Sequence, residues 1–222
     1  MKNTTLSLLL ISIIFFNACK SSQQRRAETE EEYGYISDEV RNLESVKTYA
    51  NKWEIPDESL YIIDFENYVG IVRGYVENNR RLAKDLSQWH ILMVFDSNDS
   101  LLSYQINCNT KRKNNDWQWN YLGTFNQYPP QDNSVRKYHH ELKFTDLVPV
   151  IKDAEGNSFE NQKGNKAELT IVVFWTIYHG RQSKNLIREV LDYDEKFKDK
   201  SIELVFLNHP STRIINELDE ES

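Results

Sequence analysis

The sequence predicts an α/β protein in which a mixed sheet is flanked by helices, and two stretches support this prediction. Residues 169–208 follow the pattern strand, loop, amphipathic helix and strand, which is typical of a right-handed parallel βαβ unit. Residues 37–108 follow the pattern helix, short strand, helix and antiparallel hairpin. A separate domain of about 60–70 residues would have only a marginal core. We therefore expect both stretches to contribute to one sheet.

Within the C-terminal unit, residues 171–175 are apolar on both faces, as expected of a strand covered by helices on both sides. The loop is expected at 176–182, and the helix at 183–198 with Ser183 as its cap. Apolar residues recur there at helical spacing, namely Leu186, Ile187, Val190, Leu191 and Phe197. Residues 202–207 are the second apolar strand.

The upstream elements are predicted from periodicity and from turn residues. A helix is expected over residues 37–52, before Pro56, and a strand over 60–64. The following helical stretch, 65–86, should end or kink at 78–81. Two further strands, 89–95 and 101–108, are separated by the turn residues Asp-Ser-Asn-Asp-Ser and predict a hairpin.

A family resemblance lies at the end of the first strand of the βαβ unit. The run from Phe174 to Lys184 (Phe-Trp-Thr-Ile-Tyr-His-Gly-Arg-Gln-Ser-Lys) resembles the active-site stretch of thioredoxin-like proteins. There, a strand ending in Phe-Trp precedes an aromatic residue, Cys-x-x-Cys at the helix start, and a basic residue. Residues 144–166 are similar to the segment that precedes this strand in redoxin-type members, so the resemblance covers residues 142–209.

The resemblance implies a thioredoxin-like sheet, which normally continues after this unit with an antiparallel hairpin and a helix. In this chain only a short acidic tail follows, while the helix, strand and hairpin precede the unit. The resemblance therefore predicts a permuted arrangement, in which the N-terminal half completes the sheet.

The residues at the redox positions depart from the family. Tyr178 matches the aromatic residue, His179 stands at the nucleophilic cysteine, and Gln182 stands at or near the second cysteine. Thiol–disulfide exchange requires a thiolate and a resolving thiol. Together with Gly180 and Arg181, these residues form a degenerate site loop to which we assign no catalytic residue. With no carboxylate nearby in sequence to orient it, His179 is interpreted as a polar loop residue.

The N-terminus has the pattern of a secreted lipoprotein. Lys2 precedes an apolar run, 6–16, and Asn17-Ala18-Cys19 resembles the bacterial lipoprotein cleavage motif, although Phe16 departs from the usual Leu. We expect a signal peptide at residues 1–18, lipid such as palmitate on Cys19, and a flexible tether at 19–36. No Asp follows Cys19, so the envelope site expected is the outer membrane or cell surface rather than the inner membrane.

A long polar and aromatic stretch, 109–141, separates the two halves of the predicted domain, 37–108 and 142–209, within 37–222. It contains the aromatic residues Trp117, Trp119, Tyr121, Phe125 and Tyr128. Aromatic rings beside basic residues could stack on sugars, bases or a peptide. The alternative is a loop whose aromatic residues only cover the edge of the sheet. The net charge of −7 argues against nucleic acid as a partner.

The remaining cysteine and histidine residues predict no metal or cofactor. Cys108 is left alone once Cys19 is lipidated, and we expect it to be a small apolar packing residue. His90, in an apolar strand, is expected to be hydrogen-bonded. His139, His140 and Glu141 are adjacent, and neighbours in a strand point to opposite faces.

Three functions remain open from the sequence. The first is a non-catalytic, membrane-anchored, thioredoxin-like lipoprotein that binds an envelope protein, peptide or other ligand. The second is a thiol-dependent, peroxidase-like envelope enzyme that uses Cys108. The third is a chaperone-like protein that acts without cysteine.

Overall fold

The computed structural model describes residues 43–113, 116–130, 139–159 and 167–209. Its centre is a six-stranded mixed sheet with the spatial order β3-β2-β7-β8-β1-β6. The strands are β1 (Leu60–Ile63), β2 (Ile91–Asp96), β3 (Leu101–Ile106), β6 (Ile151–Lys152), β7 (Leu169–Trp175) and β8 (Ile202–Asn208). Strands from both halves of the chain thus form one sheet, as predicted.

The central strands are parallel and the outer ones are antiparallel. β8 lies between β7 and β1 and is parallel to both, with Ile171 opposite Leu204 and Leu60 opposite Phe206. The β2–β3 hairpin joins the sheet through β2, which is antiparallel to β7. The hairpin thus precedes the βαβ unit in the chain and lies beside it in space, which is the permuted arrangement that the sequence predicts. At this coarse level the fold is consistent with a thioredoxin-like α/β sheet.

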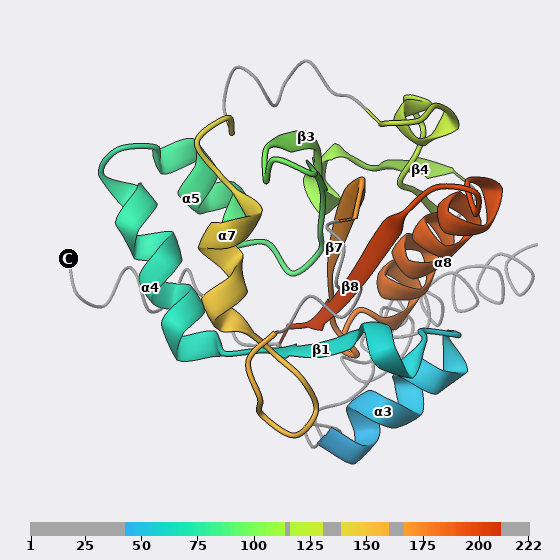
Figure 1. Cartoon of the computed structure of the whole chain (residues 1–222), viewed down its shortest axis with the longest axis horizontal. Coiled ribbons are helices and arrows are strands. Elements are labelled where there is room, and N and C mark those ends of the chain that lie inside the picture. Colours follow the sequence, from blue (N-terminus) through green and yellow to red (C-terminus); the bar gives the residue numbers. More distant parts are fainter. Residues whose placement is uncertain (1–42, 114–115, 131–138, 160–166, 210–222) are drawn as a thin grey trace, which may run out of the picture.

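Helices cover the two faces of the sheet (Figure 1). One face carries α4 (Phe65–Val76), α5 (Arg80–Leu86) and the short α7 (Phe144–Leu147). The other face carries α3 (Leu43–Lys52) and α8 (Gly180–Lys196). Along β7 the alternation is visible, since Val172 and Phe174 join the first core, while Ile171, Val173 and Trp175 join the second.

Local signals account for the helix boundaries on the first face. Asp64 caps α4 by accepting a hydrogen bond from the backbone of Asn67, and Asn79 caps α5 by accepting from Leu82. The expected end or kink at 78–81 is therefore a break between two separately capped helices. At the hairpin turn, Asp96 Oδ1 accepts from the backbone N–H groups of Asn98 and Ser100.

Three expectations need correction, and two short elements were missed. The helix α8 begins at Gly180, so Ser183 lies inside its first turn instead of capping it. The stretch 109–141, expected to lack regular structure, contains the two-stranded sheet of β4 (Lys111–Lys113) and β5 (Asp116–Gln118). The strand β6 and the helix α7 were not predicted at all, because both are too short to show a period. His139 lies in a turn, not in a strand.

Short 3-10 turns join several elements, at Asp57–Ser59, Asn107–Asn109, Thr124–Asn126 and Val148–Val150. The segment that ends at Thr124–Asn126 passes over α8, with Phe125 buried in the same core as Leu186 and Val190. The chain after β5 is thus attached to the helix of the βαβ unit. The predicted lipidation site Cys19, the signal peptide and the tether lie outside the described residues.

Candidate functional site

The degenerate site loop lies where β7 ends and α8 begins, at the carboxyl edge of the parallel strands. His179 takes the N-cap position of α8, and its side chain makes no capping hydrogen bond. The loop is largely closed to solvent. His179 and Gln182 are each 6% exposed and Gly180 is buried, while Tyr178 and Arg181 are half-buried.

An aromatic residue from the neighbouring strand covers this loop. Trp89, just before β2, packs its ring on His179 with centroids 4.3 Å apart, and on Tyr178 at 5.9 Å. The side chain of residue 179 is therefore an imidazole packed against an indole ring. A site of this shape offers a substrate no exposed nucleophile at residue 179.

Ser183 connects the loop to the strand β2. Its side chain is fully buried, and Oγ donates to the carbonyl of Thr176 at 2.6 Å while accepting from the Thr176 N–H at 3.1 Å. His90 Nε2 lies 2.9 Å from the same Oγ. Because the hydroxyl proton is used toward Thr176, His90 must donate from Nε2, which leaves Nδ1 as an acceptor. This confirms His90 as a hydrogen-bonded core residue.

Three histidines surround the end of β7. The ring of His90 lies 5.6 Å from that of His179, and the backbone N–H of His209 donates to Trp175 at 2.7 Å. Burial lowers the pKa of His90 well below its usual value, and the neighbouring His179 and His209 lower it further. His90 is therefore neutral at pH 7. Within the described ranges, no group of three or more His, Cys, Asp or Glu side chains is arranged to hold a metal ion.

Cys108 is exposed, which corrects the expectation that it packs in the core. It lies in the 3-10 turn after β3, and its Sγ is 3.7 Å from Gln88 Oε1. The expectation failed because the strand β3 ends at Ile106, two residues earlier than predicted. The side chain of Cys108 therefore lies outside the alternation that would have buried it.

His139, in contrast, is structural. Its Nε2 lies 2.8 Å from the carboxylate of Asp85 on α5, and its ring stacks on Tyr104 of β3 at 4.2 Å. This buried contact attaches the turn before α7 to the first face of the sheet.

The five aromatic residues predicted as a binding loop fall into two groups. Trp119 and Phe125 are each 2% exposed and belong to the core on the α8 side of the sheet. Trp117 and Tyr128 are half-buried, and Tyr121 is 45% exposed. Two of the five rings therefore pack in the core and three reach the surface, and binding by these three stays a prediction.

Hydrogen bonds attach this aromatic segment, residues 117–128, to α8 and to itself. Asn120 accepts from the Phe125 N–H at 2.9 Å and donates to Asn126 at 3.2 Å. From α8, Lys196 donates to the carbonyl of Asn126 at 2.9 Å, and Tyr193 donates to that of Gln127 at 3.3 Å. The segment is thus held in place at both its turn and its far end.

Between the aromatic segment and α8 lies an open groove of about 500 Å³. One wall is the run from Trp117 to Tyr121. The other wall is a polar stripe on α8, with the side chains of Asn185, Arg188, Glu189 and Asp192. Its volume is in the range of small-molecule sites, roughly 300–1,000 Å³. The residue pairs in the groove come from segments about 70 positions apart in the chain.

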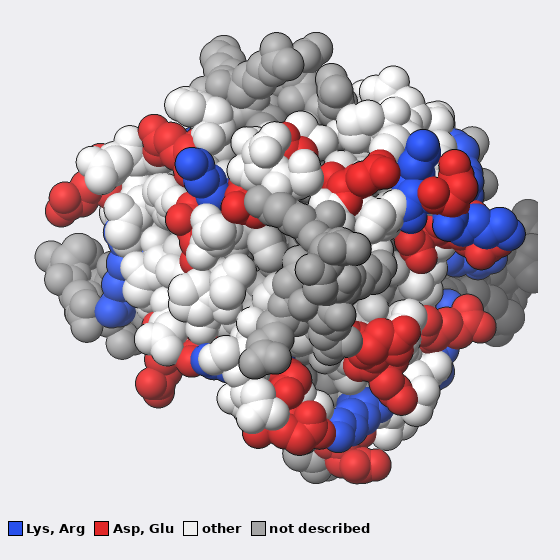
Figure 2. Space-filling view, in the orientation of Figure 1, with Lys and Arg blue, Asp and Glu red and all other residues white. Residues whose placement is uncertain are grey.

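The groove is lined by side chains of both charges. Arg188 Nε lies 4.0 Å from Asp192 Oδ2. Burial raises the pKa of Glu189, and Asp192 raises it further, against the lowering by a hydrogen bond from Asn120 and by Lys196. Figure 2 shows acidic and basic side chains intermingled over the surface where α8 and β4 lie.

The stripe on α8 was missed as a site. Its spacing, i, i+3, i+4 and i+7, marks one helical face, but in sequence it is indistinguishable from any solvated face. The signal in the sequence was that a polar helical face and an aromatic segment both occur in the chain. The sequence did not show that the two lie together in space.

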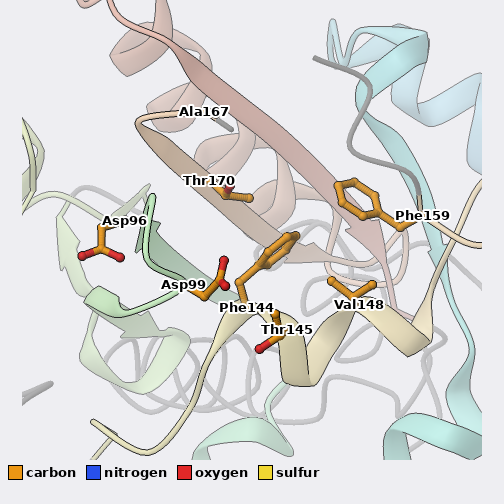
Figure 3. Close-up of a pocket in the computed structure, with 8 residues that line it drawn as sticks. All are labelled: Asp96, Asp99, Phe144, Thr145, Val148, Phe159, Ala167 and Thr170. Carbon is orange, nitrogen blue, oxygen red and sulfur yellow. The ribbon is translucent and has the colours of Figure 1, made fainter. Parts of the chain in front are cut away.

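A second pocket, of about 280 Å³, lies at the opposite end of β7, near Thr170. Phe144 and Phe159 both line it (Figure 3), and their rings meet edge to face with centroids 5.6 Å apart. Two carboxylates, Asp96 and Asp99, lie at its rim, but Asp96 is engaged in the hairpin turn. A largely apolar pocket of this kind offers a ligand few convergent polar groups.

Comparisons of the chain with models of protein families, with curated proteins and with solved structures found no match. Among the described helices, none has the length and apolar character needed to cross a membrane.

Proposed function

We propose that this chain is a non-catalytic binding module of the bacterial envelope, thioredoxin-like in architecture and held to a membrane by lipid on Cys19. The observation that carries the proposal is the closed loop at the end of β7. His179 and Gln182 stand at the redox positions and are buried, His179 beneath the ring of Trp89. A binding role needs no thiol there, whereas a thioredoxin-type activity would.

The groove between the aromatic segment and α8 is the surface that we propose for binding. It is open, it is bordered by rings and by planar polar groups, and its walls are held together by hydrogen bonds. Groups that are fixed before binding lose little conformational entropy when a ligand arrives. The site loop has the opposite character, since His179, Gln182 and Ser183 are buried and Ser183 is bonded to Thr176 and His90.

Photo-crosslinking in the intact envelope tests the binding role. The full-length chain would carry the photoreactive residue p-benzoylphenylalanine in place of Tyr121, which lines the groove. The matched control places it at the neighbouring Leu122, which is 72% exposed. We expect a discrete adduct from position 121 that position 122 does not give. No adduct, or the same adduct from both positions, would contradict binding in the groove.

The lipid anchor is tested separately. Metabolic labelling with a palmitate analogue should mark the chain, and the label should be lost on Cys19→Ser but kept on Cys108→Ser. Labelling that persists without Cys19 would show that the lipid is attached elsewhere, and no labelling of the unsubstituted chain would contradict the lipid anchor.

One observation favours the second candidate function, a thiol-dependent envelope enzyme, namely the exposure of Cys108. Insulin-reduction and peroxide-turnover assays with an external thiol distinguish the two. We expect no turnover from the full-length chain. Turnover that Cys108→Ser abolishes would replace the binding proposal with the enzymatic one.

A further inference from the structure

We infer that the groove between the aromatic segment and α8 is a saccharide-binding site that takes an uncharged glycan. The inference rests on the proposed binding function and adds the chemical class of the ligand. It depends on three features of the groove, namely the two partly exposed rings that line it, the planar polar groups of α8 and its charge balance.

The aromatic wall offers rings in a form that suits a sugar. Trp117 is half-buried and Tyr121 is 45% exposed, so both combine a fixed position with accessible ring surface. The C–H groups on one face of a pyranose form a flat apolar surface that packs against an aromatic ring. Rings of this kind carry much of the binding energy in protein recognition sites and lose little entropy.

The polar wall offers paired donors and acceptors. Asn185, Arg188, Glu189 and Asp192 present an amide, a guanidinium and two carboxylates along one stripe of α8. These planar groups can each make two parallel hydrogen bonds, which matches the vicinal hydroxyls of a sugar.

The charges in the groove argue against an anionic ligand. Arg188 is accompanied by Asp192 and by Glu189, so the polar wall carries no excess of positive charge. Burial raises the pKa of Glu189, and a hydrogen bond from Asn120 opposes that shift. Sulfated glycans, phosphorylated ligands and nucleic acids would all meet two carboxylates here. A neutral polyol meets only hydrogen-bonding partners.

The groove is also held in its shape without a ligand. Asn120 closes the turn of the aromatic segment through its contacts with Phe125 and Asn126, and Phe125 packs against Tyr193 of α8 with centroids 5.2 Å apart. The aromatic segment is therefore attached to α8 beside the polar stripe.

The test uses the full-length chain in mild detergent and a panel of defined probes. Neutral oligosaccharides (chitotriose, cellotetraose, mannotriose and laminaritriose) are compared with a heparin hexasaccharide and a mixed decapeptide pool. Binding is measured by calorimetry and by the change in tryptophan fluorescence, since Trp117 lines the groove. We expect at least one neutral oligosaccharide to bind, and the heparin fragment and the peptides not to bind.

Paired variants locate the binding. Tyr121→Ala and Trp117→Ala should each weaken the affinity about tenfold or more, while Leu122→Ala, next to the groove, should leave it unchanged. On α8, Asn185→Ala should weaken binding about fivefold, and the exposed Lys184→Ala should have no effect. Tyr121→Ala serves as the main variant because its ring is the most exposed in the wall and its loss should not disturb folding.

The outcomes separate this inference from the function on which it rests. If no neutral saccharide binds, or if the heparin fragment or the peptides bind better, the saccharide inference is wrong. If position 121 nevertheless crosslinks in the envelope, the binding function stands with a ligand of another class. If position 121 also fails to crosslink, both proposals fall together.

Discussion

The first turn of α8 and the groove-lining face of the same helix differ in the burial of their polar groups. At its N-terminus, His179, Gln182 and Ser183 are buried, and Ser183 is bonded to Thr176 and His90. One to three turns further on, Arg188, Glu189 and Asp192 line an open groove. The polar groups of the first region are closed to solvent, whereas those of the second region border an open groove that a ligand can reach.

The difference shows that a site is not defined by its place in a fold. The carboxyl edge of parallel strands is where α/β proteins usually bind ligands, yet here Trp89 and the histidines fill it. The open surface lies instead on the flank of the helix, where a segment from elsewhere in the chain forms the second wall. Four predictions test this difference between a region closed to solvent and an open one.

The largest effect is expected from Ser183→Ala. The substitution leaves the Thr176 N–H and His90 Nε2 buried without an acceptor, and each such loss costs about 1–3 kcal/mol. We expect the free energy of unfolding in urea to fall by about 3 kcal/mol. The control is Ser103→Ala in β3, whose buried Oγ has no hydrogen-bond partner among the described residues and should cost little. Equal losses from both variants would contradict the closed-region argument.

The next effect concerns pH. The pKa of His90 is lowered in the folded state, so the unfolded chain binds more protons below the unfolded pKa of about 6.5. Stability should therefore fall as the pH drops, by about 1 kcal/mol between pH 7.5 and 5.5. His179 and His209 lie near the same ring and lower the pKa of His90 further. The variant His90→Gln keeps a hydrogen-bond donor toward Ser183. Its free energy of unfolding in urea should depend less on pH than that of the unsubstituted chain. An unchanged pH dependence would exclude His90 as the group responsible.

A moderate, local effect is expected from Asn120→Ala in the wall of the groove. The variant loses the acceptor for the Phe125 N–H and a contact with Asn126, at a cost of about 1 kcal/mol. Hydrogen exchange at the Phe125 amide should quicken, while amides of β7 keep their protection. Leu122→Ala should change neither; exchange that quickens across the whole sheet would show that the segment is not a separate support of the groove.

The smallest effect on stability is expected from Cys108→Ser, within about 0.5 kcal/mol, because the side chain is exposed. The rate at which a thiol reagent modifies a cysteine measures more directly how open each region is to solvent. With Cys19 replaced by Ser, a thiol reagent should modify Cys108 as fast in the folded chain as in urea. In a chain carrying Cys108→Ser and His179→Cys, the thiol of the closed region should react much more slowly. Equal rates would mean that residue 179 is open to solvent.

Much of the architecture could be predicted from the sequence because its signals are local. The apolar run at 171–175 and the helical stripe through Leu186 and Val190 each specify an element by period alone. The two-residue strand β6 and the four-residue helix α7 have no period to read. The exposure of Cys108 was misjudged for a related reason, since strand ends are set by pairing with β2 and not by composition.

The candidate site was predicted in part. The aromatic residues of 117–128 were identified, but the sequence could not say which of them would pack, as Trp119 and Phe125 do, and which would face solvent. The sequence of the polar stripe from Asn185 to Asp192 did not indicate that the aromatic segment would lie beside it. Its role depends on a contact between segments about 70 residues apart.

The periodicity of short stretches was enough to predict the α/β class. The permuted strand order was expected from the resemblance to thioredoxin-like proteins, and the lack of a thiol at residues 179 and 182 follows from residue identity alone. The contacts of Trp89 and Ser183 at the end of β7, and the groove between the aromatic segment and α8, arise only in the folded chain. Such contacts join distant segments, and their geometry depends on how all the surrounding side chains share the same space.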